Sequence, residues 1–161
     1  MYHAIDVSRF IINYSNEKDY GISNLKLQKV LYFVQAYFLM ETEDHSPCFS
    51  EDIQAWNFGP VVPEVYYEYK QYGSNNIPYI KYYIEFDKQD IWNTRRIDYK
   101  NEIQLEDQNM IKDVVDTLSK YSASDLVDIT HRQSPWKDAY KPYANNVITI
   151  ESMKRYFLDE K

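Results

Sequence analysis

The chain has 161 residues, of which 44% are hydrophobic and 17% aromatic, so it is long and apolar enough to form the core of one domain, residues 1–161. Eighteen lysines and arginines stand against 25 aspartates and glutamates, and the net charge of −7 argues against general nucleic-acid binding. A single cysteine, Cys48, excludes an internal disulfide and is typical of a reducing compartment, so we expect a cytoplasmic protein.

The first predicted element is a mostly apolar helix over residues 1–14, and the second, over residues 25–40, is the centre of the predicted fold. Leu27, Leu31, Val34 and Phe38 recur at the spacing of one helical face, and other apolar residues cover most of the remaining surface. A helix that is apolar nearly all round is typically buried. Ser23 is well placed to cap its N-terminus.

Two amides interrupt this apolar helix. Gln28 and Gln35 are seven residues apart and share one stripe, with Tyr32 between them. One interpretation is that the amides lie on a solvated rim or cap neighbouring backbone. The other is a polar ladder at a groove that receives a partner, in which case all three residues bind that partner.

Residues 49–58 are expected to be extended, with a strand near residues 49–55, and Gly59-Pro60 then breaks the chain. The reversal delivers the indole of Trp56 onto the central helix, either as a core anchor or as a partner-binding side chain. A helix is predicted from about Pro63 to Gly73. Its stripe supplies two further candidates for partner binding, Tyr66 and Tyr69.

Apolar and polar residues alternate over residues 80–86, which predicts a half-buried strand, and residues 95–99 follow as a second strand. Arg95 and Arg96 form the one pair of adjacent arginines, which indicates either solvated surface or a phosphate contact. The β part of the fold is therefore expected to be minor, from residues 49–55 and 80–86.

The remaining predicted elements are helices. One spans residues 106–121, and another spans residues 125–131 behind a cap at Ser122 or Ser124. Ser134 is predicted to cap a short helix, and Thr149 to cap the last one. The sequence thus predicts a mainly α fold, with a minor β element, around a buried central helix.

No residue pattern indicates a catalytic, metal or cofactor site. The three histidines are widely spaced, no pair has metal-ligand spacing, and three glycines are too few for a phosphate-binding loop. Asp128 and His131 are three residues apart on a predicted helix and could pair. His131 has two interpretations: it locks the turn at Ser134-Pro135-Trp136 through backbone hydrogen bonds, or it contacts a partner together with Trp136.

Three segments resemble the SocA-like, GepA-like phage-associated family, which carries the Panacea antitoxin domain. They are LKLQKVLYFVQ at residues 25–35, EDIQAWNFGPVVP at residues 51–63 and ITHRQSPWKDA at residues 129–139. The resemblance implies an antitoxin encoded beside a toxin. Such a protein is not an enzyme, and it neutralises the toxin by binding it or by presenting it to a protease complex.

These observations leave two functional hypotheses. The first is an antitoxin-like protein that binds a cognate protein toxin, with neither a signal peptide nor a membrane involved. The alternative is a mobile-element protein that inhibits or regulates a host factor, including nucleic-acid-associated autoregulation, which requires a basic face around Lys26, Lys29, Arg95 and Arg96. The abundance of tyrosine, 17 residues, fits either a tyrosine-padded core or an aromatic docking surface. The candidate partner-binding residues are Gln28, Tyr32, Gln35, Trp56, Tyr66, Tyr69, His131 and Trp136.

Overall fold

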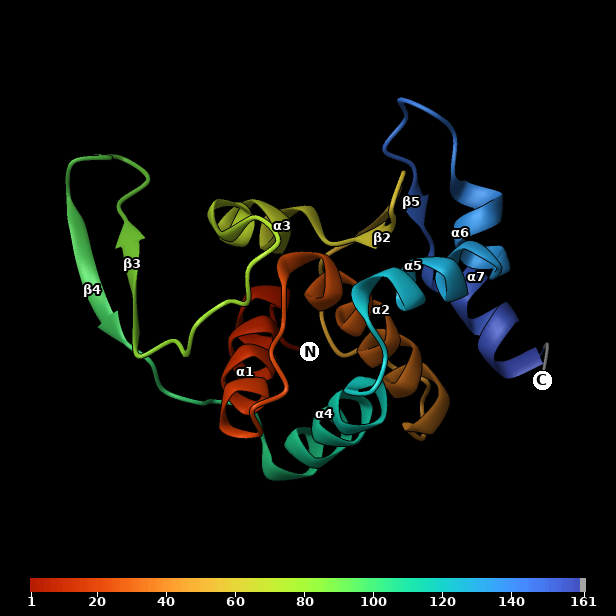
Figure 1. Ribbon diagram of the computed structural model, residues 1–161, viewed down its shortest axis with the longest axis horizontal. Coiled ribbons are helices and arrows are strands. Elements are labelled where there is room, and N and C mark those ends of the chain that lie inside the picture. The colour runs from red at the N-terminus through yellow and green to blue at the C-terminus, as the bar shows by residue number, and fades with distance from the viewer. Residues whose placement is uncertain (160–161) are drawn as a thin grey trace.

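The structure, a computed structural model, describes residues 1–159 and has helix α2 at its centre (Figure 1). The helices are α1 (Ala4–Glu17), α2 (Asn24–Glu41), α3 (Pro63–Tyr69), α4 (Leu105–Leu118), α5 (Ala123–His131), α6 (Ser134–Ala139) and α7 (Ile150–Lys154). The strands are β1 (Ile53–Trp56), β2 (Gly59–Val61), β3 (Tyr82–Phe86), β4 (Thr94–Asp98) and β5 (Val147–Ile148). The predicted class, mainly α with a minor β part, is confirmed.

Helix α2 is buried as predicted, because α1, α3, α4, α5 and α7 all pack around it. The four residues of its predicted face, Leu27, Leu31, Val34 and Phe38, are all buried. The Ser23 side chain accepts a hydrogen bond from the Lys26 amide at 3.3 Å, which satisfies a donor that the first turn would otherwise leave free.

Helix α1 begins three residues later than predicted. Tyr2 is held in extended conformation because its amide donates to the Cys48 carbonyl at 2.9 Å and its carbonyl accepts from the Ser50 amide at 3.1 Å. This short parallel bridge joins the start of the chain to the segment that leads into β1. A contact over nearly fifty residues of chain leaves no local signal in the sequence.

Strand β1 lies at the centre of a three-stranded antiparallel sheet in the order β2-β1-β5. Strand β1 itself was predicted, but β2 and β5 were not, since strands of three and two residues are too short to show an alternating pattern. Pro60 is accommodated in β2 because β2 is an edge strand and needs no amide donor on its outer side.

Strands β3 and β4 form a separate antiparallel hairpin, with Tyr82 opposite Asp98 and Phe86 opposite Thr94. The strands were predicted, but the half-buried face was not found: the hairpin extends away from the helices (Figure 1), and 64% of Phe86 is exposed. Its base is held by the guanidinium of Arg9, which lies 3.5 Å from the centre of the Tyr83 ring.

The helices of the C-terminal third begin at local caps. Ser122 and Asp125 form a reciprocal capping box at α5, which decides between the two serines that the sequence offered. The Thr149 side chain caps α7 as predicted. The predicted cap at Ser134 is wrong, because Gln133 occupies the N-cap position of α6 and Ser134 is already helical.

Candidate interaction surface

The two glutamine side chains of α2 point into the protein. Gln35 is 1% exposed, its Oε1 accepts from the amides of Cys48 and Phe49 at 2.8 and 3.1 Å, and its Nε2 donates to the Phe49 carbonyl at 3.0 Å. Gln28 is equally buried, and its Oε1 accepts from the Val62 amide at 2.9 Å. Each amide therefore completes the backbone hydrogen bonding of a neighbouring segment.

Two predicted partner-binding tyrosines are also buried. The Tyr32 hydroxyl donates to Gln133 Oε1 at 2.8 Å, and burial raises the pKa of Tyr32. Burial raises the pKa of Tyr69 to about 12, and its hydroxyl lies 3.4 Å from Ser8 Oγ. Of the two interpretations of the amide stripe, backbone capping is correct and the partner groove is not: Gln28, Tyr32 and Gln35 have their hydrogen-bonding groups occupied within the chain. Tyr69 is only 5% exposed.

A buried lysine side chain stabilises the turn between β1 and β2 by a hydrogen bond. Lys29 is 0% exposed, and its Nζ donates to the Pro60 carbonyl at 3.0 Å. Burial alone lowers the pKa of Lys29 to about 7. Gly59 crosses over this side chain with φ of +106°, and a Cβ at that position would lie 2.6 Å from Lys29 Cε and 3.0 Å from Thr130 Oγ1.

Replacing Gly59 by alanine is expected to lower the free energy of unfolding by about 3 kcal/mol, because the new Cβ meets both strained backbone and packed atoms. Urea denaturation followed by circular dichroism measures this loss. Gly73→Ala is the matched control: Gly73 also has positive φ, +56°, but a Cβ there meets nothing within 4 Å, so a loss of about 1 kcal/mol is expected. Equal losses for both variants would show that Lys29 and Thr130 yield to the new methyl group.

An aromatic cluster lies on the α3 side of this turn. The ring of Trp56 meets those of Tyr66 and Tyr67 edge to face, with ring centres 5.0 and 6.2 Å apart. The indole Nε1 of Trp56 donates to Gln54 Oε1 at 2.9 Å. Trp56 and Tyr66 are half-buried, whereas Tyr67 is 63% exposed. One side of the cluster therefore packs against the protein, and the other side faces solvent.

A stack of three rings lies on the α6 side of the same turn. His131, Trp136 and Tyr140 are stacked with ring centres 4.0 and 4.5 Å apart. The Trp136 Nε1 donates to the Trp56 carbonyl at 2.8 Å, the His131 Nε2 donates to the Asn57 carbonyl at 3.1 Å, and the Tyr140 hydroxyl donates to Asn57 Oδ1 at 3.1 Å. The stack is thus bonded directly to the turn that carries the other cluster.

Two further aromatic side chains near the cluster and the stack are exposed to solvent. Phe58, in the turn, is 61% exposed, and Tyr143 is fully exposed in a loop between α6 and β5. The backbone of Tyr143 has φ of +63°, which is uncommon for a residue with a bulky side chain. A hollow of about 420 Å³ lies between Trp56, Tyr140 and Tyr143. We call the following residues the aromatic surface: Trp56, Phe58, Tyr66, Tyr67, His131, Trp136, Tyr140 and Tyr143.

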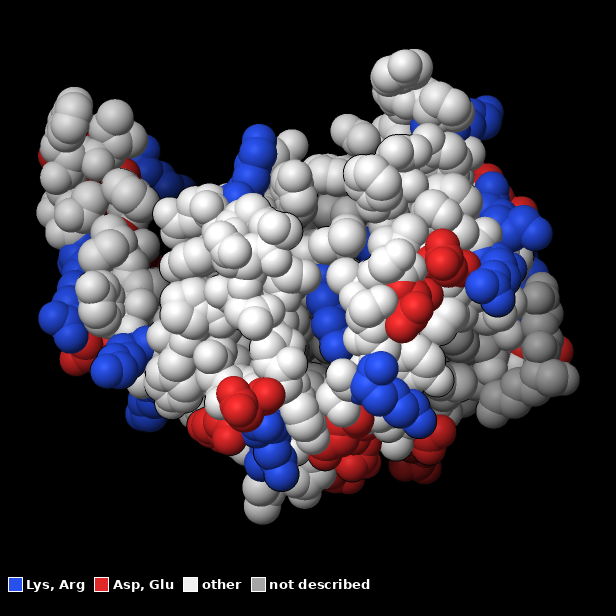
Figure 2. Space-filling model, in the orientation of Figure 1, with Lys and Arg blue, Asp and Glu red and all other residues white. Residues whose placement is uncertain are grey.

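The aromatic surface unites four of the eight predicted partner-binding residues. Trp56, Tyr66, His131 and Trp136 come from three segments and meet around one turn. In Figure 1 the three-stranded sheet lies between α3 and α6, and Figure 2 shows mostly uncharged side chains over that part of the molecule. The residues that the sequence did not single out are Phe58, Tyr67, Tyr140 and Tyr143; for the three tyrosines the only signal was the abundance of tyrosine, and Phe58 had none.

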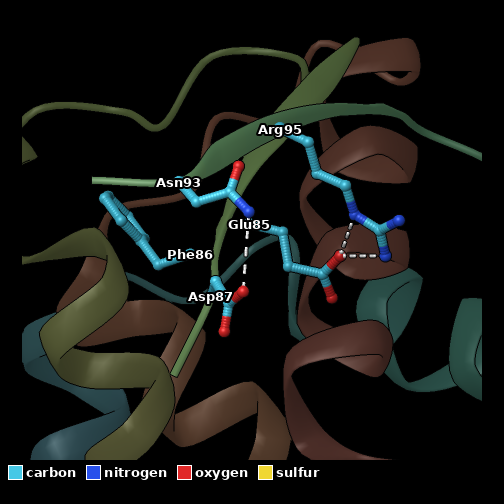
Figure 3. A pocket seen from close by; sticks show the side chains of 5 residues that line it. All are labelled: Glu85, Phe86, Asp87, Asn93 and Arg95. Atoms are coloured by element: carbon cyan, nitrogen blue, oxygen red, sulfur yellow. Dashed lines mark hydrogen bonds and ion pairs between the residues drawn. The ribbon is translucent and has the colours of Figure 1, made fainter. Parts of the chain in front are cut away.

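The hollow in the β3–β4 hairpin is a poorer candidate for a site. It measures about 270 Å³, and its polar side chains bond to one another in two pairs (Figure 3). Arg95 Nη2 lies 2.8 Å from Glu85 Oε2, and Asn93 Nδ2 lies 3.5 Å from Asp87 Oδ2. The one ion pair of this hollow is internal, and Asp87 accepts from Asn93 and from the Gln89 amide at 2.9 Å, so the hollow offers no excess cationic or catalytic group.

Within residues 1–159, three or more histidine, cysteine or carboxylate side chains do not gather as a metal ion would require. Among the helices that the structure describes, none has the length and apolarity to cross a bilayer. Cys48 is buried, and burial raises the pKa of its thiol, which disfavours the nucleophilic thiolate. His131 bonds to the Asn57 carbonyl and forms no ion pair with Asp128 in the described part of the chain.

The four cations that a nucleic-acid contact requires do not form a basic face. Lys29 is buried, and the Nζ of Lys26 donates to the Ser119 carbonyl at 3.3 Å. On the hairpin, Arg95 pairs with Glu85, and Arg96 Nε lies 3.3 Å from Asp98 Oδ1. Arg95 and Arg96 therefore belong to the paired, solvated surface.

The fold is mainly helical, and the aromatic surface is held around one tight turn. The chain belongs to the SocA-like antitoxin family with the Panacea domain, whose family model matches residues 27–137. Over 131 residues it is 33% identical to antitoxin SocA of Caulobacter vibrioides (strain NA1000 / CB15N), across 81% of this chain. The alignment covers 66% of that relative, so the chain spans just under two thirds of its length. No solved structure matches the chain.

Proposed function

We propose that this protein is a non-enzymatic antitoxin that binds a cognate protein toxin in the cytoplasm, and that the aromatic surface is where the toxin docks. Two facts support the proposal: the chain belongs to an antitoxin family, and an aromatic cluster that includes the exposed rings of Phe58, Tyr67 and Tyr143 lies around the β1–β2 turn. Scattered exposed apolar residues need no explanation, but aromatic side chains gathered in one place typically mark an interaction surface.

The aromatic surface is suited to tight binding because it is ordered before the toxin arrives. Trp136 and Tyr140 are each held by a hydrogen bond to the turn, and Trp56 by a bond to Gln54. Ordered side chains lose little conformational entropy on binding, so more of the gross contact energy is kept as affinity. The exposed rings of Phe58 and Tyr67 are then the anchors expected to enter a pocket of the partner.

The double variant Phe58→Ala/Tyr67→Ala is expected to weaken toxin binding about 100-fold, because each large exposed ring acts as an interface anchor. The partner is the product of the gene beside this one, and calorimetry or a pull-down on the purified proteins measures the affinity. Leu105→Ala is the matched control, since Leu105 is 69% exposed on α4, outside the aromatic surface, and its removal is expected to leave the affinity unchanged.

Co-expression separates the two ways in which an antitoxin acts. Growth arrest by the neighbouring protein, relieved by this chain in cells that lack the relevant protease, supports direct neutralisation. Relief that needs a host protease supports an adaptor that presents the bound toxin for degradation. A neighbour that is harmless and does not bind contradicts the antitoxin role and favours a mobile-element protein that acts on a host factor.

A further inference from the structure

A third hollow lies on a different part of the molecule, between α2, α4 and the helical turn Arg155–Asp159 that follows α7. It has a volume of about 230 Å³, and nearly all of its lining is apolar. Helices α2 and α4 form its walls and run antiparallel, since Lys26 near the start of α2 reaches Ser119 just after α4. We call it the α2–α4 groove, and its lining residues are Phe33, Ala36, Tyr37, Met40, Asp113, Val114, Thr117, Leu118 and Phe157.

Carboxylates flank one end of the α2–α4 groove. Asp113 lines the groove together with Tyr37, and Glu41 lies one helical turn after Tyr37 on α2. In keeping with this arrangement, burial and then the charges of Asp113 and Glu41 raise the pKa of the Tyr37 hydroxyl. Asp113 and Glu41 are exposed, and neither forms an ion pair within the described residues. Figure 2 shows acidic side chains along the lower edge of the molecule, where α4 lies in Figure 1.

We propose that the α2–α4 groove binds a cationic amphipathic helix of a partner protein. An apolar side chain of that helix fills the groove, and a lysine or arginine one turn away pairs with Asp113 and Glu41. Rows of side chains on the two helices line the groove on either side, and a third helix can pack between them. Other proteins bind amphipathic helices in apolar grooves in the same way. A second copy of this chain fits poorly, because two proteins of charge −7 repel each other.

This docking site is independent of the toxin contact proposed above. The α2–α4 groove shares no residue with the aromatic surface, and no residue of the aromatic surface lies on α2 or α4. One protein could therefore hold two partners at the same time. The two proposals can also fail separately, because different substitutions test them.

The test uses a fluorescently labelled helical peptide of about 14 leucines and lysines, with leucine at i, i+3, i+4 and i+7. Its binding to the full chain is measured by fluorescence anisotropy. Thr117→Trp fills the groove from the exposed face of α4, and Asp113→Lys reverses the charge at the rim, so each is expected to weaken binding at least about tenfold. Glu64→Lys, on α3, changes the net charge by the same amount and is expected to leave the affinity within about twofold.

Three results would overturn the proposal. Equal weakening by Asp113→Lys and Glu64→Lys would mean that general charge attraction holds the peptide. Full affinity in Thr117→Trp, with a helical circular dichroism spectrum like that of the parent, would mean that the peptide binds elsewhere. Self-association of the parent that Thr117→Trp abolishes would assign the groove to a second copy of the chain.

Discussion

Replacing Gln35 by leucine is expected to lower the free energy of unfolding by about 4 kcal/mol, although leucine is similar in size and more apolar. The Gln35 side chain accepts hydrogen bonds from the amides of Cys48 and Phe49 and donates one to the Phe49 carbonyl. All of these groups are buried. Leucine leaves these backbone groups without partners and keeps water out, and each orphaned buried group costs about 1–3 kcal/mol.

Urea denaturation of the parent and the Gln35→Leu variant measures this loss. Gln71→Leu is the control, because Gln71 is exposed and the same substitution there is expected to change stability by less than about 0.5 kcal/mol. A loss below about 1 kcal/mol at position 35 would mean that the segment around Phe49 finds other partners. It would also mean that this segment is not held in place by α2.

The role of Gln35 shows how far a helical pattern can be interpreted. Periodicity placed Gln28 and Gln35 on one stripe of a buried helix, which is correct, and capping of backbone was one of the two alternatives. The pattern does not say what lies opposite the stripe. The partners of Gln35 are main-chain groups of a loop, and main-chain groups have no sequence signature.

The aromatic surface was half predictable for a related reason. Trp56 and Trp136 are large aromatic residues within recognisable motifs, so both were candidates from the sequence. Their hydrogen bond joins residues 80 positions apart and depends on how α6 packs against the small sheet. Phe58 and Tyr143 are exposed because they lie in turns. Residues in turns follow no periodic pattern, so the sequence does not predict their exposure.

The β3–β4 hairpin illustrates the opposite limit. Alternation over residues 80–86 predicted a strand correctly, but it also suggested a buried face. Period-two alternation shows only that the two faces of a strand differ, not that another layer covers one of them. Here no such layer is present among the described residues, so Ile84 and Phe86 remain exposed.

Replacing Lys29 by methionine is expected to remove most of the dependence of stability on pH between pH 6 and pH 9. The lysine is fully buried, and burial lowers its pKa from 10.5 to about 7 in the folded protein. Between these two values the unfolded chain binds one proton more than the folded chain, so the stability of the parent rises with pH. The penalty is complete below pH 7 and disappears as the pH approaches 10.5.

The size of this effect follows from the difference between the two pKa values. One pH unit corresponds to about 1.4 kcal/mol, so Lys29 costs between about 4 and 5 kcal/mol at low pH and releases roughly 2.5 kcal/mol between pH 6 and 9. Methionine keeps the length of the chain but loses the bond from Nζ to the Pro60 carbonyl, worth about 1 kcal/mol. The variant is therefore expected to be about 3 kcal/mol more stable than the parent at pH 6.

Urea denaturation of both proteins at several pH values measures the effect. Every other titratable group is common to the two chains, so the difference between the two curves isolates Lys29. Curves that run parallel from pH 6 to 9 would mean that the ammonium keeps its charge in the folded state through partners other than Pro60. Curves that converge as the pH rises would establish that Lys29 is partly neutral at pH 7 in the folded protein. The cause is that the Pro60 carbonyl alone replaces the water that would otherwise solvate the ammonium group.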